Sequence, residues 1–120
     1  MADSIIEYPR RDQSIAYLTS SWSTSTSFSG SVRKCCGVVN LELRLLYTNA
    51  ETVATGTITV VPVGYRPNVN MPLIAIAKLS GMDAKVGTPV WLYTDGNLPI
   101  SFSSSRKLEE VTIVGAYSLA

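Results

Sequence analysis

The chain contains no histidine, and its only two cysteines, Cys35 and Cys36, are neighbours. Histidine is the usual general base near neutral pH, so its absence removes the Ser-His-Asp and Cys-His routes of nucleophilic catalysis. Two adjacent cysteines without a third soft ligand do not complete a tetrahedral zinc site. We therefore expect a protein that is not an enzyme and that carries no cofactor and no metal.

The adjacent cysteines also bear on redox chemistry. Neighbouring side chains of an extended strand point to opposite faces, so strand geometry opposes a bond between Cys35 and Cys36. This favours two separate thiols. A vicinal disulfide or redox switch is the alternative, and the cations Arg33 and Lys34 beside the pair keep that alternative open.

Charge is scarce and long apolar runs are absent. Only 16% of the residues are charged, and ten Lys and Arg against nine Asp and Glu leave a formal net charge of +1. The basic residues occur as scattered pairs, whereas nucleic-acid binding needs clustered cations. No run approaches the roughly 18 apolar residues of a membrane span, and the N-terminus lacks the basic start of a signal peptide. We expect no nucleic-acid partner, no membrane insertion and assembly in a cytoplasm.

What the sequence does contain is enough apolar material for one domain. The chain has 120 residues, of which 46% are hydrophobic, and a chain of this size buries roughly two-thirds of its unfolded surface. Pro9 interrupts the N-terminal segment, so residues 1–13 are predicted to form an extended arm. Residues 14–120 are predicted to form a single β-domain.

Alternation of apolar and polar residues predicts the strands of this domain. It is clearest between residues 36 and 47, where the apolar residues share one face. They are Val39, Leu41, Leu43, Leu45 and Tyr47. Further strands are predicted at residues 14–19, 55–63, 72–79, 86–94, 98–103 and 111–120, with a connection at 48–51 and a polar loop at 103–107. Seven to eight short strands predict an all-β, antiparallel β-sandwich of jelly-roll-like type.

Two segments predict sharp turns. Asp95 and Gly96 are typical of a type I′ turn, which needs positive φ at both central residues, between the two arms of a hairpin. In the segment from Val61 to Pro67, Gly64 permits a turn and Pro67 fixes the exit. Tyr65 is interpreted as burying its ring beneath this corner with its hydroxyl bonded locally. The alternative is a ligand contact, with Tyr65 stacking on a sugar and Arg66 gripping a carboxylate or phosphate.

Aromatic residues beside polar ones are the candidates for ligand contact. Trp22, Phe28, Trp91 and Tyr93 are interpreted as residues that contact a saccharide. Trp22 and Phe28 share a face if residues 20–30 form a strand, and the alternative is a Ser/Thr-rich loop. A glycosidase would need two carboxylates across a cleft. The carboxylates considered are Glu42, Asp83, Asp95, Glu109 and Glu110, and each is better explained as a solvated or turn residue.

The order of these features resembles a known family. The hexapeptide from Pro62 to Pro67, P-x-G-Y-R-P, precedes a strand at residues 73–79, a D-G turn within residues 90–100 and a last strand ending near Tyr117. This order is similar to that of small β-domains in receptor-binding and baseplate tail proteins of phages that infect Gram-positive bacteria. Independently of the resemblance, Gly64, Tyr65, Arg66, Pro67, Asp95 and Gly96 are interpreted as residues of structural turns.

The resemblance implies a non-enzymatic, structural or adsorption-accessory protein of a phage tail or baseplate. It implies location in the virion tail after assembly in the host cytoplasm, with other phage tail proteins as partners. A homotrimer and a monomer are both open. The alternative function is a carbohydrate-binding module that recognises a saccharide of the host cell wall.

Overall fold

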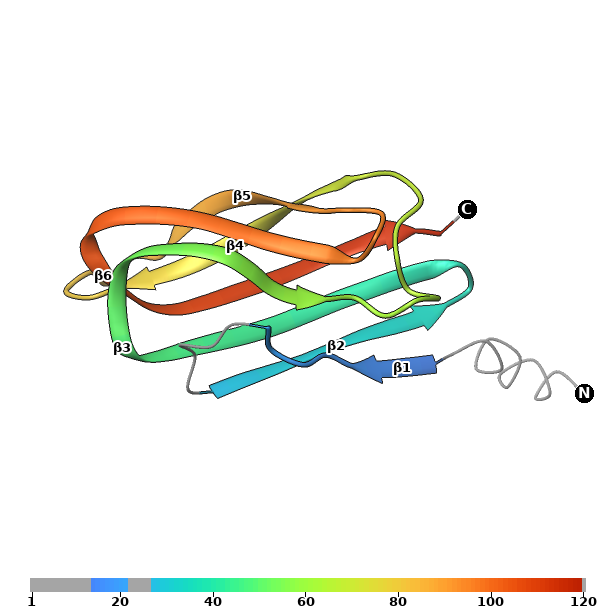
Figure 1. The fold of residues 1–120 in the computed structure, drawn as a ribbon, viewed down its shortest axis with the longest axis horizontal. Coiled ribbons are helices and arrows are strands. Elements are labelled where there is room, and N and C mark those ends of the chain that lie inside the picture. The colour runs from blue at the N-terminus through green and yellow to red at the C-terminus, as the bar shows by residue number, and fades with distance from the viewer. Residues whose placement is uncertain (1–13, 22–26, 120) are drawn as a thin grey trace, which may run out of the picture.

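A computed structural model describes residues 14–21 and 27–119, with the backbone but not the side chains of residues 47–54 and 103–105. This part of the chain is all-β, with eight antiparallel strand segments in a six-stranded sheet and a two-stranded sheet (Figure 1). The predicted all-β sandwich-like architecture is therefore confirmed. The arm predicted for residues 1–13 lies outside the described residues.

Six continuous strands build the two sheets. They are β1 (Ser14–Tyr17), β2 (Ser27–Cys35), β3 (Val38–Val60), β4 (Met71–Leu79), β5 (Val86–Leu92) and β6 (Asn97–Ser118). Their order is β1-β2-β3-β6-β4-β5, and every neighbouring pair is antiparallel. β3 and β6 have 23 and 22 residues, so each is long enough to take part in both sheets.

The two long strands bend together (Figure 1). The first half of β3 pairs with the second half of β6 in the large sheet, and the remaining halves pair with each other as the small sheet. Register shifts between Leu46 and Val53 mark the bend, as expected because irregular pairing increases strand curvature. The predicted connection at residues 48–51 and loop at 103–107 are thus wrong, since both segments continue a strand.

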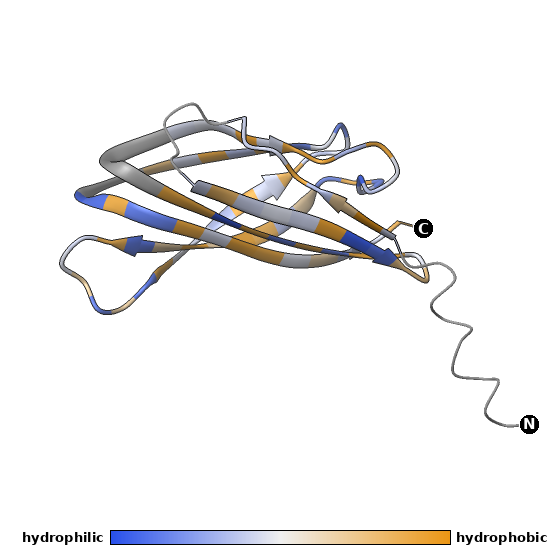
Figure 2. Cartoon of the chain, turned by 90° about the horizontal axis from the view of Figure 1, so that it is seen from below, coloured by the Kyte–Doolittle hydropathy of each residue, from blue (hydrophilic) through white to orange (hydrophobic). Residues whose placement is uncertain are grey.

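Buried apolar side chains form one core to which both sheets contribute. Val39, Leu41, Leu43 and Leu45 are buried as the alternation predicted, while the side chain of Tyr47 lies outside the described residues. The small sheet adds Ile58, Leu98 and Ile100 to the same cluster. Figure 2 shows hydrophobic and hydrophilic positions alternating along the strands. Among the described residues, no helix has the length and apolar character needed to cross a membrane.

The type I′ turn lies elsewhere than predicted. Gly96 has a φ of 88°, but Cys36 alone has a positive φ among the described non-glycine residues, so Asp95 does not adopt the predicted conformation. Gly96 N–H donates to Tyr93 O at 2.9 Å and Tyr93 N–H donates to Asn97 O at 3.0 Å. These bonds indicate a three-residue loop with glycine in the left-handed position.

The two arms predicted to form a hairpin around this loop do not pair along their length. β5 pairs with β4, whereas residues 97–103 of β6 pair with the second half of β3. The Asp95-Gly96 turn therefore carries the chain from the large sheet into the small one.

Candidate functional site

The two segments that carry the family resemblance meet in space. Val61 N–H donates to Gly96 O at 2.8 Å, and Arg66 Nε donates to Val61 O at 2.7 Å. A Cβ atom on Gly96 would lie 2.3 Å from Val61 O and 2.6 Å from Arg66 Nε, so only glycine fits between them. We call residues 61–67 and 94–97 together the corner–turn joint. Its contacts give Arg66 and Gly96 structural roles.

The corner is also tied to distant strands. Tyr65 is half-buried against the core, and its hydroxyl donates to Ser14 Oγ at 2.9 Å. The expectation of a local bond for this hydroxyl is wrong, because Ser14 belongs to the edge strand β1. Lys34 Nζ donates to Gly64 O at 2.9 Å and lies 4.9 Å from the centre of the Tyr65 ring. The corner is thus bonded to β1 through Ser14 and to β2 through Lys34.

Tyr117, on the last strand, supports the corner from inside. Its hydroxyl donates to Tyr65 O, and burial raises the pKa of Tyr117 to about 12. A buried hydroxyl of this kind needs its acceptor, because an unpaired polar group in the interior is costly. Gly64, with a φ of 98°, and the buried Pro67 complete the corner.

Trp91 and Tyr93 lie together at an open cleft of about 340 Å³. Val90 and Leu92 face the core, so Trp91 between them points outward and is 47% exposed. Tyr93 follows at the start of the turn and is 38% exposed. The other residues that line the cleft are Thr55, Gly56, Thr57, Pro89, Pro99, Ile100 and Ser101. We call this the aromatic cleft.

The aromatic cleft joins the two sheets. β5 supplies its aromatic wall, and the small sheet supplies the opposite wall. Thr57 Oγ1 donates to Asn97 Oδ1 at 2.8 Å and so fixes that wall. Ligand pockets usually exceed about 300 Å³ and combine apolar walls with a few polar groups. The cleft has exposed rings for stacking and the hydroxyls of Thr55 and Ser101 for hydrogen bonding.

The remaining aromatic candidates are placed differently. Phe28 lies on β2, is half-buried and packs against the core, so its ring serves packing. β3, β6 and β4 separate β2 from β5, and the structure does not bring Phe28 to the aromatic cleft. Trp22 lies outside the described residues.

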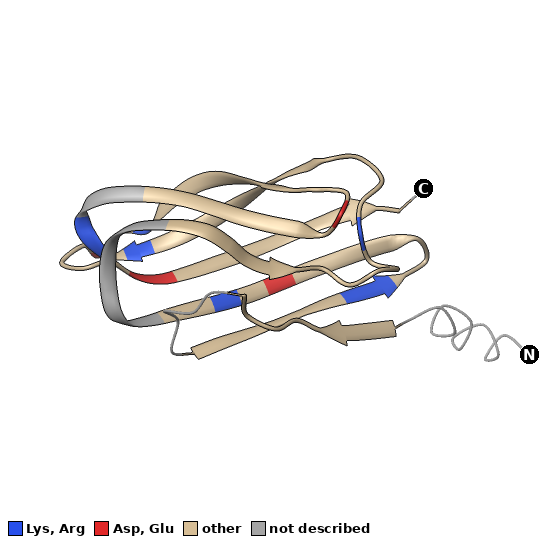
Figure 3. Ribbon diagram, in the orientation of Figure 1, with Lys and Arg blue, Asp and Glu red and all other residues tan. Residues whose placement is uncertain are grey.

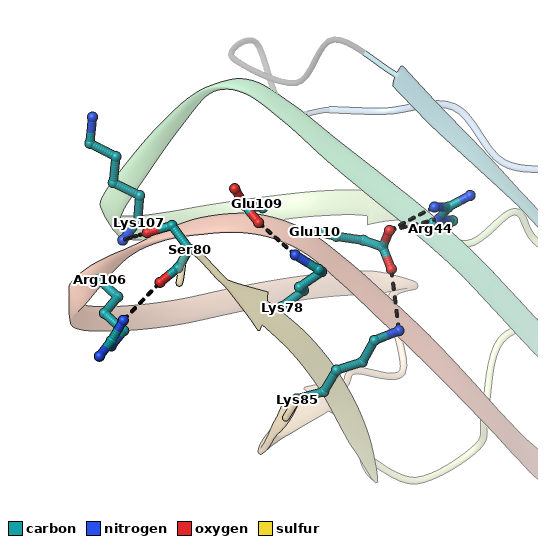
Figure 4. A network of polar contacts seen from close by, with 8 residues as sticks. All are labelled: Arg44, Lys78, Ser80, Lys85, Arg106, Lys107, Glu109 and Glu110. Carbon is teal, nitrogen blue, oxygen red and sulfur yellow. Dashed lines mark hydrogen bonds and ion pairs between the residues drawn. The ribbon is translucent and has the colours of Figure 1, made fainter. Parts of the chain in front are cut away.

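Three of the candidate carboxylates, Asp95, Glu109 and Glu110, contact cations or backbone, and Figure 4 shows the contacts of Glu109 and Glu110. Arg44 Nη2 lies 2.7 Å and Lys85 Nζ 3.7 Å from the carboxylate of Glu110. The hydrogen bond from Arg44 is the main reason that the pKa of Glu110 is lowered. Glu109 binds Lys78 at 2.8 Å, and Asp95 accepts a bond from Asn97 N–H. No group of three or more metal-ligating side chains occurs in the described part of the chain.

A feature that sequence reasoning missed is the outer face of the large sheet. Cross-strand partners form a row across all six strands, from Tyr17 on β1 to Pro89 on β5. Its members are Tyr17, Ser31, Glu42, Val114, Ile74 and Pro89. Tyr17 is 80% exposed and borders a groove of about 390 Å³ over β2, β3 and β6.

The same face is apolar over β4 and β6. Ile74 and Val114 are direct cross-strand partners, 55% and 61% exposed, and Ile76 follows on β4. We call Ile74, Ile76, Val114 and Pro89 the outer apolar block. The available sequence signal was the weak alternation in residues 72–79, where both faces of the strand are apolar.

No protein-family model matches the chain, and no curated protein matches it.

Proposed function

We propose that the protein is a non-enzymatic, structural or adsorption-accessory component of a phage tail or baseplate. The observation that carries this proposal is the corner–turn joint. The resemblance rests on two short segments that are about 30 residues apart in the sequence, and these segments bind each other through Val61, Arg66 and Gly96. The shared segments therefore form one structural unit, which supports a common scaffold with the phage domains. The jelly-roll-like arrangement belongs to the same proposal.

The outer apolar block is the surface that we propose for contact with other phage tail proteins. Ile74 and Val114 expose much of their side chains on the outer face of the large sheet, and contiguous exposed apolar surface is typical of protein interfaces. We place the protein in the virion tail, after assembly in the host cytoplasm. Its state on the particle is a homotrimer or a monomer.

The protein content of purified phage particles tests this function. Particles of the phage that encodes the chain would be purified on a density gradient and analysed by quantitative mass spectrometry. We expect each particle to contain a fixed number of copies of the chain, and we expect these copies to remain bound after a high-salt wash. Loss of the chain from gradient-purified particles would refute it.

A second candidate function is a carbohydrate-binding module for a saccharide of the host cell wall, favoured by the aromatic cleft. Trp91 and Tyr93 present exposed rings beside hydroxyl groups, a combination that suits the apolar face and the hydroxyls of a sugar. Phe28 does not take part in this cleft, because it lies on β2 with its half-buried ring packed against the core.

Tryptophan fluorescence tests the second function. In a Trp22→Phe variant, emission comes from Trp91 alone. Titration with host cell-wall polysaccharide is expected to shift this emission, and Tyr93→Ala is expected to weaken the response about tenfold, since losing one stacked ring costs about 1 kcal/mol or more. Val69→Ala is the matched control. An unchanged emission at millimolar saccharide would contradict the candidate function.

A further inference from the structure

The turn between β2 and β3 brings the two cysteines together. Cys35 ends β2 and pairs with Val38, which leaves Cys36 and Gly37 as a two-residue loop. Their φ angles are 56° and 79°, and positive φ at both residues is the mark of a type I′ turn. Because Cys36 is left-handed and not extended, the two side chains do not point to opposite faces. Their Sγ atoms lie 3.5 Å apart.

The two cysteines are accessible, and the turn that carries them is held in place. Cys36 is exposed and Cys35 is half-buried. Leu119 N–H donates to Gly37 O at 2.9 Å, and the adjoining Val39 is fully buried, so the C-terminal strand holds the turn in place. A Cβ atom built on Gly37 would meet nothing within 4 Å. The tip of the hairpin is therefore uncrowded at Gly37, beside the exposed Cys36.

The sulfur separation is that of two thiols in hydrogen-bond contact, and it is also the separation that one bridging atom requires. A disulfide requires the sulfurs to approach to about 2.05 Å. One soft atom with two bonds of about 2.3 Å to sulfur spans the observed 3.5 Å at an angle of about 100°. The described residues hold no cluster of three ligands, so a centre bound here must bring its own remaining substituent. Trivalent arsenic meets both conditions, and thiolates prefer such soft centres.

We propose that Cys35 and Cys36 form a preorganised dithiol site that chelates a trivalent arsenical. With an organic arsenic oxide, two As–S bonds form and the As=O bond breaks. The oxygen leaves as water with the two thiol protons, so arsenic keeps its oxidation state and no oxidant or reductant is needed. The site goes beyond the proposed tail function and does not depend on it.

Phenylarsine oxide and intact-mass spectrometry test the site. The folded protein is expected to gain one phenylarsenic group per chain, equal to the reagent less one water. A large excess of a monothiol should leave this adduct in place, whereas 2,3-dimercaptopropanol should remove it. Cys35→Ser and Cys36→Ser should each abolish the monothiol-resistant adduct. An adduct that a monothiol removes, or one that survives in either serine variant, would overturn the proposal.

Variants that keep both cysteines test whether the turn contributes to the affinity for the arsenical. Gly37→Asn should retain affinity, because asparagine tolerates positive φ, whereas Gly37→Val should lose it about tenfold as the preorganised turn is strained. The wild-type chain in urea should lose affinity to a similar extent. Equal affinity in the folded and the unfolded chain would show that adjacent cysteines suffice without the turn and would overturn the structural claim. Circular dichroism verifies that each variant is folded.

Discussion

Glu110 is the carboxylate with the most binding partners in the described part of the chain. Its side chain is mostly buried, with Arg44 bonded to one oxygen and Lys85 near the other. The hydrogen bond from Arg44, opposed by desolvation, lowers the pKa of Glu110 below its ordinary value of 4.5. A carboxyl group with a lowered folded pKa stabilises the fold above its unfolded pKa, and that stabilisation disappears as the pH falls through the folded pKa.

Glu110→Gln is therefore expected to weaken the acid dependence of stability. The wild-type free energy of unfolding should fall as the pH drops below about 4.5, and the variant should show a smaller fall. Urea unfolding at a series of pH values measures both. Glu109→Gln is the control, because its exposed pair with Lys78 is screened by solvent and contributes little. Equal pH slopes for wild type and Glu110→Gln would contradict the assignment.

Tyr117→Phe removes the hydroxyl that donates a hydrogen bond to Tyr65 O. We expect a loss of about 1 kcal/mol or more, since a buried acceptor loses its donor. The raised pKa predicts that the wild-type advantage is full below pH 10.0 and is lost as the pH rises through about 12. Chemical unfolding at neutral and alkaline pH measures this. The exposed Tyr93→Phe should change stability by less than about 0.5 kcal/mol, and a similar loss in both variants would count against the buried bond.

Local sequence patterns predicted some of the strands and missed the bends within others. The alternation of residues 39–45 predicted both a strand and its buried face, because a period of two leaves no other way to bury four apolar residues. The bends at residues 48–51 and 103–107 were missed because their polar residues were interpreted as loops, whereas both strands continue through the bend, with Glu51 paired to Leu108 and Ser103 paired to Val53. That pairing depends on a partner far away in the sequence, which local composition does not reveal.

The sequence predicted the turns and the candidate site only in part. The Cys36-Gly37 turn adopts the type I′ conformation without the usual Asn or Asp, so its sequence gave little signal. In the candidate site, Trp91 and Tyr93 were predicted because they are aromatic residues beside polar ones in the sequence. The opposite wall of the aromatic cleft, formed by residues 55–57 and 99–101, was not predicted, because it arises from the small sheet. Phe28 is a different case. Its ring lies beside serines in the sequence and was interpreted as a surface residue, but it packs against the core.

Gly96→Ala tests the corner–turn joint as an element. The added Cβ would clash with Val61 O and Arg66 Nε, and φ is positive, so we expect a loss above about 2 kcal/mol. Gly37→Ala is the matched control, because it also has a positive φ but its Cβ meets open space. Its cost should be about 1 kcal/mol from backbone strain alone. Urea unfolding compares the two, and a smaller loss for Gly96→Ala would contradict the close packing of the joint.

The described part of the chain carries the outer apolar block on β4, β5 and β6, and Figure 3 shows charged residues on strands of the same sheet. Ile74→Lys with Val114→Lys changes only exposed side chains, so stability should change by about 1 kcal/mol or less. Incorporation into phage particles should fall at least about tenfold, since a charge in an apolar interface costs more than 1.4 kcal/mol. Mass spectrometry of purified particles measures this. Val63→Lys, 79% exposed on the corner, should incorporate normally, and equal incorporation of all variants would exclude this face as the interface.

Immunogold electron microscopy of intact phage particles tests whether the protein is a component of the phage tail. Antibodies raised against the purified protein would be applied to particles of the phage that encodes it, with particles from a deletion mutant as the control. The tail assignment predicts gold at the tail or baseplate of wild-type particles and none on the mutant. Gold on the head, or an equal background on both particles, would contradict it.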